Sequence, residues 1–148
     1  MTQLKIDLIA ENLIAIHPLL HKCISKPLRQ QSSVTLGGIF VMSSLKQHGT
    51  LSMSDIGKCN SMPKPHITLI VDKLIEEGYV ERQSDPKDRR IVNILLSEKG
   101  ITDFEILKQA MSENLKSKLL LLEDDELEIL SSATRKVKEI LNSILSKE

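Results

Sequence analysis

The 148-residue sequence predicts a mainly α-helical fold with one small β-hairpin. Near both ends of the chain, apolar residues recur three and four positions apart, which is the spacing that lines one face of a helix. Between residues 79 and 96 the period changes to two, which is typical of paired strands. A hydrophobic fraction of 41% is ordinary for a folded globular chain and is too high for a disordered one.

The first predicted helix covers residues 4–23. Its apolar stripe consists of Leu4, Leu8, Ile9, Leu13, Ile16, Leu20 and Ile24. Pro18 removes one backbone donor, so we expect a bend there. We expect Pro27 and the polar residues 29–33 to end this helix.

A second helix is expected to start at Thr35, whose hydroxyl can accept hydrogen bonds from the unpaired amides of the first turn. It should end at His48 and Gly49, because glycine commonly follows the last turn of a helix. Shorter helices are then predicted over residues 52–58 and 63–77.

The turn between these shorter helices is predicted at Asn60 and Ser61. Two short helices across a tight turn are typical of a helix-turn-helix. In the second of them, the side chains predicted to face inward are Ile67, Ile70, Val71 and Leu74. Those predicted on the other faces are Lys64, His66, Thr68, Asp72 and Lys73. This helix therefore has a polar outward surface.

A β-hairpin follows, with strands over residues 79–83 and 91–96 and a charged tip over residues 84–90. This hairpin, called here the wing, directly follows the predicted helix-turn-helix. Three basic side chains, Lys87, Arg89 and Arg90, crowd the tip. Asp88 would be unfavourable beside phosphate, so we interpret it as the partner that positions Arg90.

The C-terminal third is predicted to form two more helices. Residues 97–100 are expected to end the hairpin, and a helical stripe begins after Ile101: Phe104, Leu107, Met111, Leu115, Leu119 and Leu122. A last helix should start at Asp124 and Asp125, where acidic groups favour the positive end of the helix dipole. Its apolar residues are Leu127, Leu130, Val137, Leu141, Ile144 and Leu145.

The formal charge is zero, from 20 basic and 20 acidic side chains, but the charge is unevenly distributed. Residues 1–50 carry five basic and two acidic groups, and residues 101–148 carry seven and ten. Neutrality therefore does not exclude a nucleic-acid partner, because basic groups can gather on one surface.

Several classes of protein are excluded by motif and composition. No apolar run approaches the roughly 20 residues of a membrane span, and no signal peptide is recognisable. Two cysteines without metal-type spacing fit a reducing cytoplasm, and we predict a cytoplasmic protein that does not bind membranes. We find no nucleophile elbow, glycine-rich phosphate loop or paired carboxylates, so we expect no enzyme activity, catalytic residue, cofactor or metal.

The winged helix-turn-helix predicts binding to double-stranded DNA. Its second helix would enter the major groove, where base edges present distinct donors and acceptors, and the wing would reach a minor groove that attracts arginine. The predicted DNA-binding residues are Lys64, Pro65, His66, Thr68, Leu69, Lys73, Lys87, Asp88, Arg89 and Arg90. Among them, Leu69 offers only an apolar contact, such as one to a thymine methyl group.

The chain resembles the MarR family of winged-helix transcriptional regulators over essentially its whole length. The resemblance is carried by residues 51–57, by residues 67–82 with the Gly78-Tyr79-Val80 joint, and by the D-P-K-D-R-R wing at residues 85–90 followed by L-S-E-K-G. It implies an obligate homodimer on a pseudo-palindromic operator. Residues 1–33 and 101–148 would form the dimerisation domain, and residues 34–100 the DNA-binding domain.

The resemblance also implies regulation. Many members are repressors that leave DNA when a small aromatic or lipophilic effector binds, or when a cysteine is oxidised. Cys23 does not match the N-terminal sensing-cysteine pattern of the peroxide-responsive branch. Leu69 replaces a position that is frequently polar or basic, so the base preference of other members does not carry over.

Some residues allow more than one interpretation. Cys59, beside Lys58, is either a reactive thiol that controls DNA binding or a small buried apolar residue. His17 and His21 stand four apart, which suits one face of a metal site, but a crevice for an effector or a dimer interface is the preferred interpretation. A winged helix that binds only protein is a further alternative, although such a module has no need for basic residues in the wing.

Overall fold

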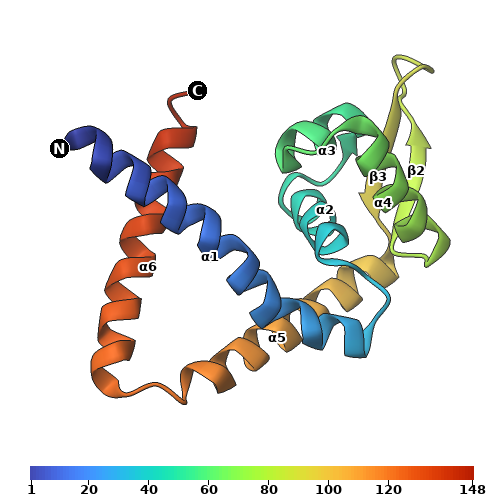
Figure 1. The fold of residues 1–148 in the computed structure, drawn as a ribbon. Helices are drawn as coiled ribbons and strands as arrows, with labels where there is room; N and C mark the ends of the chain where they lie inside the picture. Colours follow the sequence, from blue (N-terminus) through green and yellow to red (C-terminus); the bar gives the residue numbers. More distant parts are fainter. The chain divides into compact units, whose positions relative to one another are not determined.

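The structure is a computed structural model that describes the backbone of all 148 residues and every side chain except those of residues 27, 30 and 31. The elements are α1 (Thr2–Gln31), α2 (Leu36–His48), β1 (Leu51–Ser52), α3 (Met53–Asn60), α4 (Lys64–Glu76), β2 (Val80–Ser84), β3 (Val92–Leu96), α5 (Glu98–Leu119) and α6 (Asp124–Leu145) (Figure 1). The chain forms two compact units, Met1–Ser112 and Glu113–Glu148. The predicted mainly α-helical fold with a small β-hairpin is confirmed.

Helix α1 is longer than predicted, because it continues beyond Cys23 and ends at Gln31, inside the polar stretch expected to end it. It is also continuous through Pro18. Its last part is held by packing, since Leu28 is buried in the core and its carbonyl accepts the Ser32 amide at 3.0 Å. Periodicity alone did not show this extension, because few apolar residues follow Ile24.

The helix starts and turns that precede α4 are confirmed. The Thr35 hydroxyl accepts a hydrogen bond from the Gly38 amide at 3.1 Å, which caps α2. The Ser52 hydroxyl accepts one from the Asp55 amide at the same distance and caps α3. Ser61 has a left-handed backbone with φ of 50°, which turns the chain from α3 towards α4. Local side-chain chemistry thus fixes where these helices begin and end.

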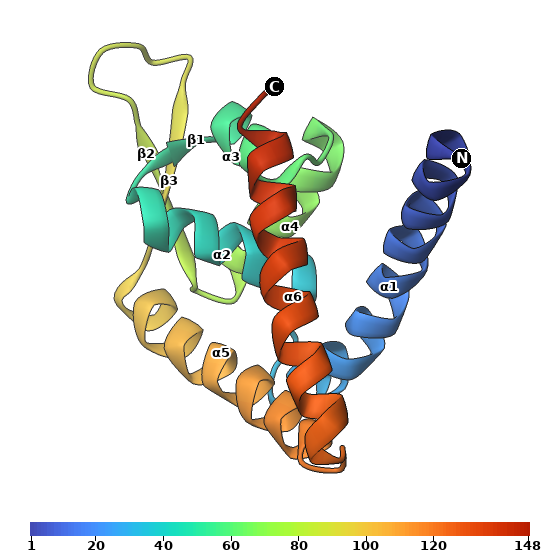
Figure 2. The same ribbon diagram turned by 90° about the vertical axis from the view of Figure 1, so that its left-hand side faces the viewer.

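The sheet is antiparallel, with the strand order β1-β3-β2. Residues Val80 and Ser84 of β2 pair with Leu96 and Val92 of β3, so the predicted hairpin is confirmed. Figure 2 shows the hairpin tip projecting beyond the helices beside it. The short strand β1 was missed, because two residues are too few to show a period; Leu51 pairs with Ile94.

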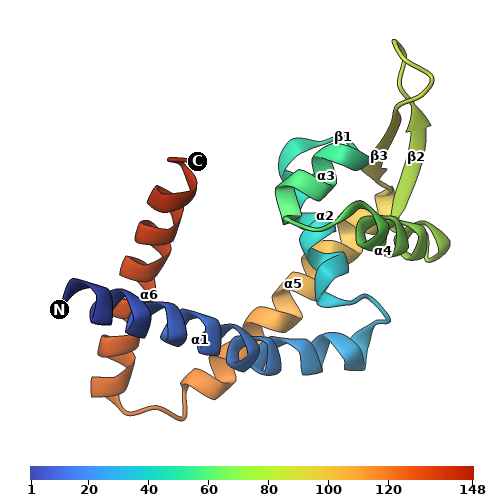
Figure 3. The same cartoon turned by 45° about the horizontal axis from the view of Figure 1, so that its top comes forward.

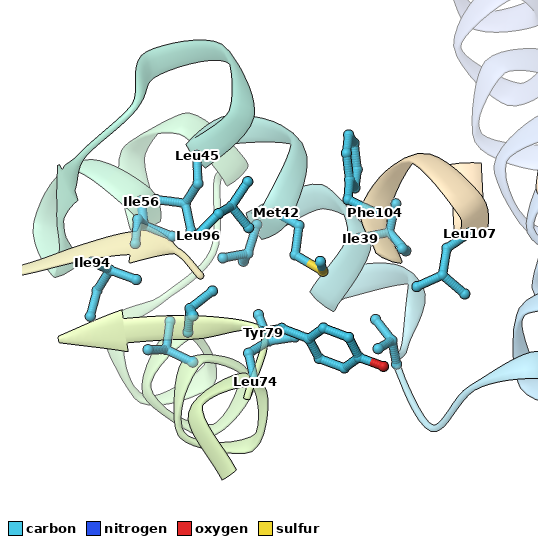
Figure 4. Packing of buried hydrophobic residues seen from close by; sticks show 14 of the residues in the cluster. Ile39, Met42, Leu45, Ile56, Leu74, Tyr79, Ile94, Leu96, Phe104 and Leu107 are labelled. Carbon is cyan, nitrogen blue, oxygen red and sulfur yellow. The ribbon is translucent and has the colours of Figure 1, made fainter. Parts of the chain in front are cut away.

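One hydrophobic core joins α2, α3, α4, the sheet and the first turns of α5 (Figure 4). Its fully buried side chains include Met42 and Leu45 of α2, Ile56 of α3 and Ile94 of β3. Phe104 and Leu107 of α5 join the same cluster. This core places α4 and the wing in fixed relation to one another.

Helix α5 begins at Glu98 and not, as predicted, at Ile101. The Ser97 hydroxyl accepts a hydrogen bond from the Gly100 amide at 3.0 Å and so supplies the cap. Gly100 is buried, and a Cβ built on it would lie 2.0 Å from the Tyr79 carbonyl oxygen. Residues 97–100, which were expected to end the hairpin, therefore form the cap and the close-packed first turn of α5.

The second unit contains α6, which begins at Asp124 as predicted. A reciprocal capping box between Glu123 and Glu126 closes its first turn. None of its residues, all of which the structure describes, is buried within the single chain. Across the described part of the chain, no helix combines the length and apolar character that crossing a membrane requires.

Candidate nucleic-acid interface

The exposed side of α4 carries the predicted contact residues of this helix. Ile67, Val71 and Leu74 are buried and Ile70 is half-buried, which confirms the predicted inward stripe. The side chains on the opposite side are exposed, apart from the half-buried Thr68: Lys64, Pro65, His66, Leu69 and Lys73. Helix α4 packs against α2, α3 and β2 (Figure 3). The side of α4 away from these contacts is mostly polar.

The start of α4 favours an anionic partner. Pro63 is the residue before the helix and supplies no side-chain cap, and the first turn contains Lys64 but no acidic residue. The second helical residue, Pro65, has no amide hydrogen that needs a partner. Because the N-terminus of a helix carries partial positive charge, this end of α4 is suited to approach phosphate.

The wing tip is organised by the Asp85 carboxylate. One of its oxygens accepts the Lys87 amide at 2.8 Å and the Asp88 amide at 3.1 Å. The other accepts the Asn93 side-chain amide at 3.0 Å. These hydrogen bonds, that of Lys87 foremost, stabilise the ionised form and hold the pKa of Asp85 below its ordinary value. The tip is therefore an ordered turn around one carboxylate.

Both carboxylate oxygens of Asp88 accept hydrogen bonds from the Arg90 side chain. The Arg90 Nε donates to Oδ1 at 3.1 Å, and Nη2 donates to Oδ2 at 3.2 Å. The Arg90 backbone amide also donates to Oδ1 at 3.0 Å. The Arg90 side chain lowers the pKa of Asp88, and the backbone amide adds to the effect. The predicted Asp88–Arg90 pair is confirmed, and the Arg90 side chain that it holds is still 90% exposed.

A groove of about 940 Å³ brings part of the predicted set together. Lys64 and Thr68 of α4 line it on one side, and Arg90 of the wing lines it on another. Residues of α3, including Lys58, form a further wall. Cationic side chains from α3, α4 and the wing, together with the Thr68 hydroxyl, therefore face one hollow, called here the α4–wing groove.

The other predicted residues lie outside the α4–wing groove. His66, Leu69 and Lys73 line a smaller hollow of about 200 Å³ between α4 and the start of α2. The side chains that line neither hollow are Pro65, Lys87, Asp88 and Arg89. The predicted DNA-binding set thus covers both flanks of α4 and the wing tip.

Sequence reasoning missed Arg82, which lines the α4–wing groove and forms an ion pair with Asp72. This pair ties the outward side of α4 to β2. It was not predictable from spacing, because a helix residue and a strand residue ten positions apart meet only after the chain folds. Lys58 was also missed as a groove residue, since its distance from Arg90 in the sequence gives no indication of their proximity.

The interpretation of Cys59 as a buried apolar residue is wrong, because the side chain is exposed. The inward place at the end of α3 is taken by Asn60. Its amide donates to the Ile56 carbonyl at 2.9 Å and to the Ser44 hydroxyl at 3.2 Å. Cys59 is consequently left on the outer side of the helix.

His17 and His21 are both exposed on α1, and neither lines the two hollows described above. The described residues contain no group of three or more side chains placed to hold a metal ion. An effector crevice near these histidines stays a prediction.

The MarR family pattern matches residues 34–92, which span α2 to the start of β3. The chain is 33% identical to the HTH-type transcriptional repressor MdtR of Bacillus subtilis, over 51% of this chain and about half (49%) of that protein. It is 31% identical to the transcriptional regulator YcgE of the same organism, over 70% of this chain and 67% of YcgE.

Two solved structures share the fold over most of their length. The regulator BldR of Sulfolobus solfataricus is 25% identical and has a TM-score of 0.79, with full coverage of both chains. A mutant form of MarR from E. coli, solved in complex with operator DNA, is 22% identical and has a TM-score of 0.70. That comparison covers 90% of this chain and 95% of the MarR chain. The winged-helix fold is therefore shown along nearly the whole chain.

Proposed function

Because the chain belongs to the MarR family, we propose that it is a sequence-specific, DNA-binding transcription regulator that acts as a homodimer on a pseudo-palindromic operator. The α4–wing groove carries this proposal, since it joins Lys64 and Thr68 of α4 to the braced Arg90 of the wing. Binding of operator DNA by a MarR protein of the same fold supports it.

In the proposed complex, α4 enters the major groove, which is about 12 Å wide and admits one helix. Lys64 and Lys73 neutralise phosphate or donate to guanine, and His66 and Thr68 form hydrogen bonds with base edges. Pro65 and Leu69 make the apolar contacts. Contacts from α4 therefore provide most of the sequence specificity.

The wing contributes affinity in the same complex. Arg90 enters the minor groove, where a narrow width strengthens the negative potential, and Lys87 and Arg89 contact phosphate. Asp88 contacts Arg90 and does not contact the DNA. The Arg90 guanidinium compensates the negative charge of Asp88. In this complex the wing positions the protein on the duplex, and α4 reads the bases.

The dimer is proposed from the unburied apolar stripes of the terminal helices. Leu8 and Ile16 of α1 are at least half exposed, as are Ile140 and Ile144 of α6. A second copy of the chain would cover such surface. We assign residues 1–33 and 101–148 to dimerisation and residues 34–100 to DNA binding. Two copies of α4 would then read the two halves of a symmetric operator.

We also propose that the protein is a cytoplasmic repressor that a small aromatic or lipophilic effector releases from DNA. The description of MdtR as a repressor supports the negative role. The effector would have to bind the DNA-incompetent dimer more tightly than the DNA-bound form. His17 and His21 are the proposed contact residues for it.

Selection from randomised duplex DNA tests the proposed function directly. The full chain should enrich one sequence with two related, inverted halves, because a symmetric dimer presents the same surface twice. Binding of the selected duplex should weaken steeply with salt, since each neutralised phosphate releases counterions. Failure to enrich any sequence, with a folded protein, would refute sequence-specific binding and favour a winged helix that binds only protein.

A second candidate is redox control through Cys59. This candidate is favoured because Cys59 is exposed and follows Lys58, which lines the α4–wing groove. Oxidation of an exposed thiol near the DNA-facing surface would add bulk or charge where DNA approaches. We expect a thiol oxidant to weaken binding of the selected duplex by the parent protein and to have no effect on the Cys59→Ser variant. An oxidant that leaves binding by the parent protein unchanged removes this candidate.

A further inference from the structure

Leu69 lies near the middle of α4 with its side chain 73% exposed. Among the residues of α4, all of which are described, it is the one large apolar side chain that is exposed. A single exposed leucine is ordinary on a protein surface, so exposure alone assigns it no role. A role for Leu69 therefore depends on the residues around it.

Leu69 and its neighbour Thr68 line different hollows. Thr68, directly before it, faces the α4–wing groove. Leu69 itself borders the smaller hollow, together with His66 and Lys73. The leucine thus lines the smaller hollow, and cationic or hydrogen-bonding side chains lie near it in both hollows.

The polar groups beside Leu69 are partly engaged within the protein. The Thr68 hydroxyl donates to the Lys64 carbonyl at 2.9 Å. The Asp72 carboxylate, one turn further along, is paired with Arg82. That pairing compensates the acidic charge one turn from Leu69. The acidic residue that lines the smaller hollow with Leu69 is Glu77, which follows the last residue of α4.

We propose that Leu69 reads the 5-methyl group of a thymine in each operator half-site, an inference that rests on the proposed function. In the major groove, the thymine methyl is the apolar group that base edges present. Leucine has no donor or acceptor and gains only by burying apolar surface. A protein-docking role is disfavoured, because such a surface needs contiguous apolar area. The residues one turn away from Leu69 include the charged Asp72 and Lys73.

Deoxyuridine differs from thymidine by the missing methyl group, so it isolates this contact. Each thymine of the selected half-site is replaced in turn, and the Kd is measured for the parent protein and for Leu69→Ala. For the parent we expect one replacement per half-site to weaken binding about fourfold, the worth of roughly one buried methyl group. The Leu69→Ala variant should lose that penalty at the same thymine and keep the penalties at others.

Phe40→Ala is the control, since Phe40 is an exposed apolar residue of α2 that lines neither hollow and lies outside the proposed dimerisation ranges. This variant should keep the parent pattern of penalties. If a sequence is enriched but every deoxyuridine penalty persists in Leu69→Ala, the assignment of Leu69 is overturned while the proposed function stands. If no sequence is enriched, the proposed function fails and this inference fails with it.

Discussion

At the scale of single residues, the proposed DNA-binding surface contains carboxylates that hold cations in place. Asp88 fixes Arg90 through three hydrogen bonds, and Asp72 holds Arg82 beside α4. In both cases an acidic residue near the proposed path of a polyanion is compensated by an arginine. An exposed ion pair contributes little to stability, so its proposed value here lies in orientation.

Two substitutions separate the charge of Arg90 from its orientation. We expect Arg90→Ala to weaken binding of the selected duplex and to flatten its dependence on salt, because one cation leaves the interface. Asp88→Asn should weaken binding less and leave the salt slope nearly unchanged, because Arg90 stays but loses its ionic partner. Titrations at several salt concentrations measure both quantities.

Arg135→Ala, which removes an arginine of α6, is the control for the loss of one positive charge. It should change neither affinity nor slope by as much as Arg90→Ala. An Arg90→Ala variant with the affinity and slope of the parent would contradict the assignment of the wing to DNA.

At the scale of elements, the first turn of α5 packs against the joint between α4 and β2, the first strand of the wing. Ser97 caps α5 and its hydroxyl also donates to the Gly78 carbonyl, while Gly100 lies against the Tyr79 backbone. Gly78 itself has φ of 83°, which ends α4 and turns the chain into β2. The end of α4, the start of β2 and the first turn of α5 therefore form one closely packed joint.

Gly100→Ala tests this joint. A Cβ at this position would clash with the Tyr79 carbonyl oxygen, so we expect a loss of roughly 1–3 kcal/mol in the free energy of unfolding, as for other overpacked sites. Helix propensity alone predicts the opposite sign, a gain of about 1 kcal/mol. Urea unfolding measures the difference. Thr102→Ala, an exposed substitution in the same helix, should be close to neutral or stabilising; a Gly100→Ala protein as stable as the parent would contradict the close packing.

At the scale of the whole molecule, neutrality and exposed apolar stripes set the expected behaviour. The zero formal charge predicts modest non-specific attraction to DNA, so the local cations and the geometry of two half-sites should carry the selectivity. Those two half-sites require two copies of α4. The exposed apolar residues of α1 and α6 are the surfaces that a second copy would bury.

Light scattering at micromolar concentration tests the dimer. We expect a particle of twice the 16.6 kDa chain mass. Ile144→Lys should shift the population towards the monomer, because it places a charge within the apolar stripe of α6. It should weaken binding of the two-half operator at the same time. Ser143→Lys, at the adjacent exposed position, should leave the mass unchanged. A folded parent protein with the mass of one chain would refute the dimer.

The sequence by itself determined most element types and many boundaries. The cap at Thr35, the glycines after α2 and α4 and the alternation in the wing depend on interactions between residues close in sequence. Such local interactions can be predicted from the sequence. The inward stripe of α4 and the Asp88–Arg90 pair were predictable for the same reason. The start of α5 was mistaken because Ser97 and Gly100 serve equally as terminators or as a capped, tightly packed first turn.

Only the tertiary structure decided what depends on segments distant in the sequence. Strand β1 exists because β3 supplies its hydrogen bonds, and the Asp72–Arg82 pair forms because β2 packs beside α4. The α4–wing groove likewise joins Lys58, Lys64 and Arg90 from three elements. Cys59 is exposed because Asn60 takes the inward place. Such proximities follow from packing around a shared core, which residue spacing along one chain does not encode locally.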